Sequence, residues 1–159
     1  MCQLVVADYR RCLIMRIVQS FYVARPQELV FGYASDPSKL GRWQTSNRSV
    51  EQITPGPVGV GSRFRERTRP PGMREFEQIT EFAEFDRPRR FRVHVVEGPQ
   101  LIDGAWNFES VGDGTRVTFA ADGALRGAVR FVEPLVRWVL ARRFATYHRN
   151  LRLNLETGE

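Results

Sequence analysis

The sequence contains almost no lysine, few cysteines and histidines, and no long apolar run. Lys39 is the only lysine among 24 basic residues. The two cysteines, Cys2 and Cys12, lack the spacing of a zinc or redox motif, and His94 and His148 lie far apart in the chain. We therefore expect no metal site and no cofactor. No apolar stretch approaches the roughly 20 residues of a membrane-spanning helix, and no ordered secretory signal is present. These absences predict a cytoplasmic protein.

The composition is typical of one folded domain. The chain has 159 residues, of which 42% are hydrophobic and 26% charged, and this excludes a disordered or collagen-like protein. The net charge is +6, but the arginines are dispersed along the chain, so we expect no nucleic-acid partner. Residues 1–14 are expected to be an N-terminal extension, or the result of a misplaced start codon, before a single domain over 15–159. The sequence leaves the oligomeric state open between monomer and homodimer.

Turn residues divide the chain into short strands between helical segments. Short connections rich in glycine and proline join antiparallel neighbours, so the strands are expected to form a meander. Near the C-terminus the apolar period becomes helical, and Pro134 predicts a kink or a new helix start. The expected elements are a strand over 14–24, helices over 26–35 and 36–43, strands over 47–54, 60–69, 74–86, 90–97, 102–110 and 115–123, and a helix over 126–156 with the apolar stripe Val136, Leu140, Phe144, Tyr147, Leu151 and Leu155.

This order of elements, together with several local motifs, resembles a known superfamily. The motifs are FYVARPQELVFGYASDP followed by RW, the turn GPVGVGSRF, then EFDRPRRF, and GDGTRVTF before the last helix. They are similar to the polyketide cyclase/dehydrase-like branch of the START and birch-pollen-allergen-like (SRPBCC) superfamily, over about residues 15–156. The resemblance implies an α+β helix-grip fold, in which a curved antiparallel sheet of six or seven strands wraps around a long C-terminal helix. It implies no universal catalytic motif, because members include lipid and hormone carriers as well as cyclases.

Charge alternation predicts the register of one hairpin. The strands 60–69 and 74–86 each carry charged residues on one face and mostly aromatic or small polar residues on the other. One register places three arginines opposite three glutamates, and such pairs stabilise a sheet by about 0.2–1 kcal/mol each. The pairs are Arg69 with Glu75, Arg67 with Glu77, and Arg63 with Glu81. We therefore assign the arginines to the convex, solvated face.

The same alternation directs a carboxylate inward. Glu66, Gln78, Thr68 and Thr80 would then lie on the concave face among phenylalanines, where an unpaired carboxylate costs several kcal/mol. Glu66 and Gln78 either orient a ligand, or Glu66 lies in water at the mouth or bonds to Gln78 without any role in binding. The predicted ligand-binding residues are Phe21, Trp43, Phe64, Glu66, Phe76, Gln78, Thr80, Phe82, Val93, Val95, Trp106, Phe119 and Trp138.

Three functional hypotheses follow. The first is binding of a hydrophobic small molecule, such as a lipid, fatty acyl chain or polyketide-like ring system, between sheet and helix. The second is a cyclase/aromatase or dehydratase without a covalent nucleophile, in which Glu66 is the candidate acid or base. The third is a membrane- or protein-interaction module that uses apolar residues of the C-terminal helix, Phe131, Leu135 and Trp138, with neighbouring arginines. Neither His94, on the outer face, nor His148 is expected to be catalytic.

Overall fold

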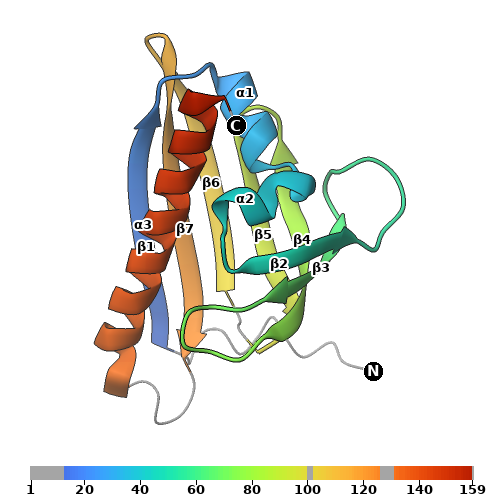
Figure 1. Cartoon of the computed structure of the whole chain (residues 1–159), viewed down its shortest axis with the longest axis vertical. Coiled ribbons are helices and arrows are strands. Elements are labelled where there is room, and N and C mark those ends of the chain that lie inside the picture. The colour runs from blue at the N-terminus through green and yellow to red at the C-terminus, as the bar shows by residue number, and fades with distance from the viewer. Residues whose placement is uncertain (1–12, 100–101, 126–130, 159) are drawn as a thin grey trace.

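A seven-stranded antiparallel sheet curves around one long helix in the computed structural model, which describes residues 13–99, 102–125 and 131–158 (Figure 1). The strand order is β1-β7-β6-β5-β4-β3-β2, so each strand after β2 pairs with the one before it and β1 completes the sheet beside β7. The strands are β1 (Leu13–Val23), β2 (Asn47–Gln52), β3 (Arg63–Thr68), β4 (Phe76–Asp86), β5 (Arg90–Glu97), β6 (Ile102–Val111) and β7 (Gly114–Leu125).

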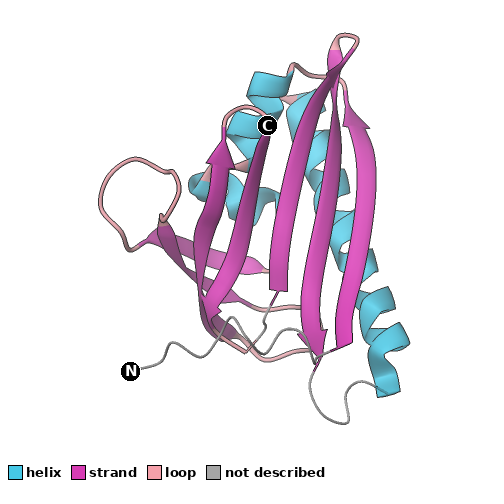
Figure 2. Cartoon of the chain, turned by 180° about the vertical axis from the view of Figure 1, so that it is seen from behind, coloured by secondary structure: helices cyan, strands magenta, loops and turns pink. Residues whose placement is uncertain are grey.

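The helices of the described residues lie on one face of this sheet (Figure 2). They are α1 (Gln27–Ala34), the 3₁₀ turn η2 (Pro37–Lys39), α2 (Leu40–Trp43) and α3 (Glu133–Thr157). This is the helix-grip arrangement that the sequence predicted, with each expected strand present within a few residues of its predicted bounds. The largest difference is at α3, which begins at Glu133 because Pro134 occupies its first turn, and β1 begins at Leu13, among the residues predicted to be an extension. The predicted helical residues 126–130, and residues 1–12 of the predicted extension, lie outside the described residues.

The short helices after β1 begin where capping residues predict them. Asp36 caps η2, since its side-chain Oδ1 accepts a hydrogen bond of 2.9 Å from the backbone N–H of Ser38, and Pro37 follows at the first helical position. Pro26 precedes α1, and its carbonyl oxygen accepts hydrogen bonds from the backbone N–H groups of Leu29 and Val30. These two turns bring α2, and with it Trp43, over the concave face of the sheet.

The register of β3 and β4 is the predicted one. Arg63 lies opposite Glu81, with their charged groups 2.6 Å apart, and Arg67 lies opposite Glu77 at 3.6 Å. The ladder ends at Thr68 and Phe76, so the predicted pairing of Arg69 with Glu75 is wrong. The backbone N–H of Arg69 instead donates a 2.8 Å hydrogen bond to the carbonyl of Ser46. Arg69 lies after the end of β3, where the chain turns away from its pairing with β4 at Pro70-Pro71-Gly72.

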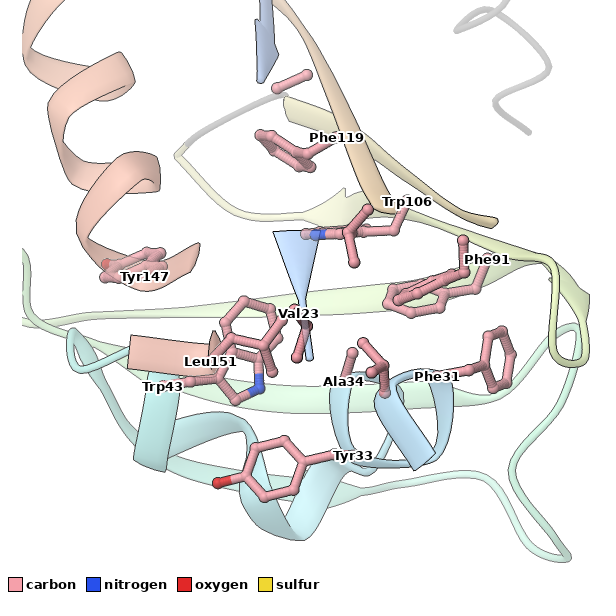
Figure 3. Packing of buried hydrophobic residues seen from close by; sticks show 14 of the residues in the cluster. Val23, Phe31, Tyr33, Ala34, Trp43, Phe91, Trp106, Phe119, Tyr147 and Leu151 are labelled. Carbon is pink, nitrogen blue, oxygen red and sulfur yellow. The ribbon is translucent and has the colours of Figure 1, made fainter. Parts of the chain in front are cut away.

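The core lies between the concave face of the sheet and the helices (Figure 3). The inward stripe of α3 packs there as predicted: Leu151 is fully buried and Phe144 contacts Phe119 of β7 at 4.8 Å between ring centroids. Phe31 of α1 and Phe91 of β5 meet edge to face at 5.7 Å. Ring contacts of this kind continue across the sheet, so the interior near its middle is predominantly aromatic.

Candidate functional site

The grip leaves a cavity of about 130 Å³ between the sheet, α2 and α3. Its wall is mainly aromatic and aliphatic, with a small number of polar groups, which is the usual composition of a small-molecule site. Residues from the strands that line it are Asn47, Val50, Phe64, Glu66, Thr68, Gln78, Thr80, Phe82, Phe91, Val93, Val95, Ile102, Gly104, Trp106 and Phe119. Residues from the helices and their ends are Ala34, Ser35, Asp36, Pro37, Leu40, Trp43, Gln44, Arg143, Phe144 and Tyr147.

Glu66 of β3 is buried, and among the described residues it is the only carboxylate that the sheet contributes to this wall. Its Oε1 accepts a hydrogen bond of 2.7 Å from the hydroxyl of Thr80. Its Oε2 accepts from the side-chain amides of Gln78, at 3.1 Å, and Asn47, at 3.5 Å. Thr68 in turn donates to Oδ1 of Asn47 at 2.9 Å, which orients the amide toward Glu66. The local bond to Gln78 that the sequence allowed is present, within a larger polar cluster.

Burial and hydrogen bonding act on Glu66 in opposite directions. Burial is the larger effect and raises the pKa of the Glu66 carboxyl above its ordinary value of 4.5, while the bonds from Thr80, Gln78 and Asn47 lower it. The position of Glu66 at the mouth, in water, is therefore not the one that the structure shows. Such a carboxyl is suited to holding a proton at a higher pH than an exposed glutamate would.

A second space, an open groove, lies next to the cavity at the end of the sheet where β1 begins and β7 ends. Its volume is about 680 Å³, and it runs between the first half of α3, the turn over residues 70–73 and the start of β1. Ile102, Arg143 and Tyr147 line both spaces, so the cavity and the groove are neighbours across these three side chains.

Most of the predicted ligand-binding residues come together in the cavity wall. Phe21 does not line it; its ring instead stacks on His148 at 4.9 Å. Phe76 is half-buried at the end of the hairpin and lines neither space, and Trp138 is 56% exposed and also lies outside both. The residues that line the cavity as expected are Trp43, Phe64, Glu66, Gln78, Thr80, Phe82, Val93, Val95, Trp106 and Phe119. Whether they bind a ligand stays a prediction.

Several residues of the cavity wall were not predicted from the sequence, and two of them, Asn47 and Arg143, carry its polar chemistry. Asn47 was treated only as the start of a strand, and its approach to Glu66 depends on the pairing of β2 with β3. Arg143 was counted among the dispersed arginines. Its spacing was an available signal, because it follows Leu140 by three residues and precedes Tyr147 by four, which places it on the inward stripe of the helix.

His148 is buried beside the cavity without lining it. Its Nδ1 lies 2.9 Å from Oε1 of Gln19, whose Nε2 donates to the carbonyl of Ala141 at 2.7 Å. Because that Gln19 oxygen is an acceptor, His148 donates from Nδ1. Burial lowers the pKa of His148 from 6.5 to about 4. His148 and Gln19 thus join α3 to β1 in a neutral hydrogen-bonded pair.

The first half of α3 exposes apolar side chains. Leu135, Trp138 and Val139 are each at least half exposed, and the guanidinium of Arg142 lies 5.0 Å from the centre of the Trp138 ring. The hypothesis of a membrane or protein contact at this surface stays a prediction. None of the helices in the described part of the chain is long and apolar enough to span a membrane. Over the same residues, no group of three or more histidine, cysteine, aspartate or glutamate side chains could hold a metal ion.

The curved sheet, the long helix and the cavity between them together define a helix-grip protein. The sequence model of the family described as polyketide cyclase/dehydrase and lipid transport matches residues 15–156. The chain belongs to this family. No curated protein sequence gives a significant match.

Solved structures of the same fold include proteins of different kinds. TTHA0849 from Thermus thermophilus superposes with a TM-score of 0.78 at 21% identity, covering 91% of this chain and 99% of that one. The Zhui aromatase/cyclase from Streptomyces sp. R1128 gives 0.75 at 14% identity, covering 91% and 94%. Ara h 8.0201 gives 0.71 at 9% identity, covering 91% and 99%. At these identities the comparisons show a shared fold and no more.

Proposed function

We propose that the cavity binds a hydrophobic small molecule, such as a lipid, a fatty acyl chain or a polyketide-like ring system, between the sheet and α3. The observation that carries this proposal is the aromatic cavity of about 130 Å³ beside the buried cluster around Glu66. A bound apolar molecule would gain dispersion contacts with the rings of Phe64, Trp106 and Phe119, while the cluster would orient its polar atoms. The family description, which names both cyclisation and lipid transport, supports the same class of ligand.

The test is a titration with N-phenyl-1-naphthylamine, a neutral apolar dye that fluoresces when it leaves water. We expect the wild type to bind the dye and Val95→Trp to bind it with an affinity at least about tenfold lower. Val95 lines the cavity, and the larger side chain would occupy that space. Val18→Trp is the matched control, because Val18 is 59% exposed on β1 and lines neither space. Extraction of the purified protein with organic solvent, followed by mass spectrometry, would identify a co-purified ligand.

Two results would contradict the proposal. One is a wild type that does not bind the dye at any concentration below the dye's solubility limit. The other is equal affinity of the wild type and Val95→Trp, which would place the bound dye outside the cavity.

A second candidate function is catalysis of cyclisation or dehydration in the same cavity. It is favoured by one observation: Glu66 is a buried carboxyl that lines the cavity and whose pKa is raised by burial. A protonated Glu66 would donate its proton to a ligand oxygen that leaves as water, and the ionised form would then take a proton from the adjacent carbon. No covalent nucleophile is needed, because a cavity that holds a flexible chain in one folded shape itself accelerates ring closure.

The test of the second candidate uses a synthetic linear polyketone thioester. Wild type and Glu66→Gln are compared by the products that each forms, with Glu97→Gln as the control for loss of an exposed glutamate at the end of β5. We expect cyclised or dehydrated product with wild type and Glu97→Gln, and about a hundredfold less with Glu66→Gln, which is within the range for loss of a general acid or base. Equal turnover by Glu66→Gln would remove Glu66 from the mechanism.

A further inference from the structure

Arg143 is half-buried and has no hydrogen-bond or ion-pair partner among the described residues. It lines both the cavity and the open groove, and its Nε atom is buried. In the part of the chain that the structure describes, no hydrogen bond or ion pair joins Arg143 to another residue. Its contact is with the ring of the neighbouring Phe144, whose centre lies 5.8 Å from the guanidinium carbon. The guanidinium of Arg143 is therefore free to bind water or a ligand in the space beside it.

Several outer arginines are paired instead. Arg63 pairs with Glu81 at 2.6 Å, and Arg137, on the same helix as Arg143, pairs with Glu133 at 3.7 Å. Arg143 is half-buried, with its Nε covered, and partial burial of a cation without a counter-charge opposes folding; burial accordingly lowers the pKa of Arg143. A methionine or leucine would pack against Phe144 without that penalty. The stability of the fold therefore does not explain why a charged residue occupies this position.

The cavity also has unused hydrogen-bond donors. The indole N–H groups of Trp43 and Trp106 are buried and have no acceptor among the described residues, and the two rings meet edge to face at 6.4 Å (Figure 3). On the acceptor side of the same wall, Oε1 of Gln78 is buried without a donor from the described part of the chain. With Arg143, unpaired donors outnumber unpaired acceptors, so the wall is suited to a molecule that brings oxygen acceptors.

From these contacts we infer that the molecule received by the cavity carries an anionic oxygen group, such as a carboxylate, enolate or phenolate, on its apolar body, and that Arg143 binds that group. This inference rests on the proposed function, because it names the chemical class of the ligand that the cavity binds.

The two carboxylates of the wall, Asp36 and Glu66, do not oppose this. Asp36 accepts hydrogen bonds from Ser38 and lies 3.7 Å from the ammonium of Lys39, so its charge is already compensated. The oxygens of Glu66 already accept hydrogen bonds from Thr80, Gln78 and Asn47, so Glu66 does not require Arg143 as a counter-ion. An ionised Glu66 would repel an anionic ligand, but burial raises the pKa of this carboxyl and so favours its neutral form. A neutral Glu66 and a charged Arg143 would together accept an anion.

The experiment compares two dyes that share one apolar body. N-phenyl-1-naphthylamine is neutral, and 8-anilinonaphthalene-1-sulfonate is the same ring system with an anionic sulfonate. Each is titrated into wild type, Arg143→Met, Arg143→Lys and Arg149→Met. Arg149→Met is the matched control, since Arg149 lies on the same helix, carries the same charge, is exposed and lines neither space.

We expect Arg143→Met to weaken binding of the sulfonate about tenfold or more, the effect of losing one charge-assisted hydrogen bond, and to leave the neutral dye within about twofold. Arg143→Lys keeps the charge and should retain most of the preference for the sulfonate, and Arg149→Met should match the wild type with both dyes. Thermal melts of all variants check that each is folded; if Arg143→Met is not, Arg143→Gln replaces it.

The outcomes separate this inference from the proposed function. If Arg143→Met binds both dyes as the wild type does, Arg143 does not recognise the anion and the inference fails, while the cavity remains a hydrophobic binding site. If Arg149→Met loses the sulfonate as strongly as Arg143→Met, the effect is one of net charge and the inference also fails. If neither dye binds the wild type, both the inference and the proposed function fail.

Discussion

The hydroxyl of Thr80 on β4 donates a 2.7 Å hydrogen bond to Oε1 of Glu66 on the neighbouring strand β3, and both side chains are buried. This contact shows how the sheet keeps a carboxyl group on its concave face. The strands are antiparallel neighbours, so residues diagonal to one another on the same face come within reach of each other's side chains.

Glu66→Gln should change the way in which stability depends on pH. Burial raises the pKa of Glu66 above 4.5 in the folded protein, so above pH 4.5 the folded chain binds more protons at this site than the unfolded chain. The wild type therefore loses stability at this site as the pH rises from 4.5 toward the folded pKa, and Glu66→Gln does not. We expect the stability of Glu66→Gln relative to wild type to increase over that interval, as measured by urea unfolding.

The control for this comparison is Glu97→Gln, which removes an exposed carboxylate. Parallel pH curves for wild type and Glu66→Gln would contradict the assignment of a raised pKa to Glu66.

His148 should make the protein less stable as the pH falls, which is opposite to the effect of Glu66. Burial lowers its pKa from 6.5 to about 4, so between these values the unfolded chain binds the proton and the folded chain does not. The folded protein therefore loses about 3 kcal/mol at this site as the pH falls from 6.5 to 4. We expect His148→Gln to have a shallower loss of stability over this interval. An NMR titration in which the His148 ring gains its proton near pH 6.5 would refute the prediction.

The contact of α3 with the sheet depends on its inward stripe. Leu151 is fully buried, whereas Leu153, two residues further along the same helix, is 45% exposed. We expect Leu151→Ala to lower the free energy of unfolding by about 2–5 kcal/mol, because it removes buried methyl groups and leaves a cavity. Leu153→Ala should stay within about 0.5 kcal/mol of wild type. Similar losses in the two variants, measured by urea unfolding, would mean that α3 is not held by this face.

Trp138→Ala separates cavity binding from surface contact. The side chain is 56% exposed and lies outside both the cavity and the groove, so we expect the affinity for N-phenyl-1-naphthylamine to stay within about twofold of wild type. A larger loss would show that Trp138 contacts the ligand.

Flotation of wild type and Trp138→Ala with anionic vesicles tests the hypothesis of a membrane contact. This hypothesis predicts that the wild type binds the vesicles and that Trp138→Ala binds them more weakly. A wild type that does not bind would exclude the hypothesis.

Local chemistry was sufficient to predict the elements and one register. Asp36 and Pro37 favour a helical start through local chemistry alone, and the alternation of Arg63, Phe64, Arg65 and Glu66 distinguishes one face of the strand from the other. The end of the hairpin was predicted less well, since the loss of pairing at Arg69 depends on its bond to Ser46 from another part of the chain.

The sequence by itself thus determined that a carboxyl group would face inward at Glu66, because the period of a strand is two residues and needs no tertiary information. Only the tertiary structure decided that Asn47 would bond this carboxyl, that His148 would be buried against β1, and that Arg143 would face a cavity without a partner among the described residues. These outcomes depend on the curvature of the sheet and on the distance at which α3 packs against it. Both are set by the summed fit of many side chains from distant parts of the chain, and no local pattern encodes that sum.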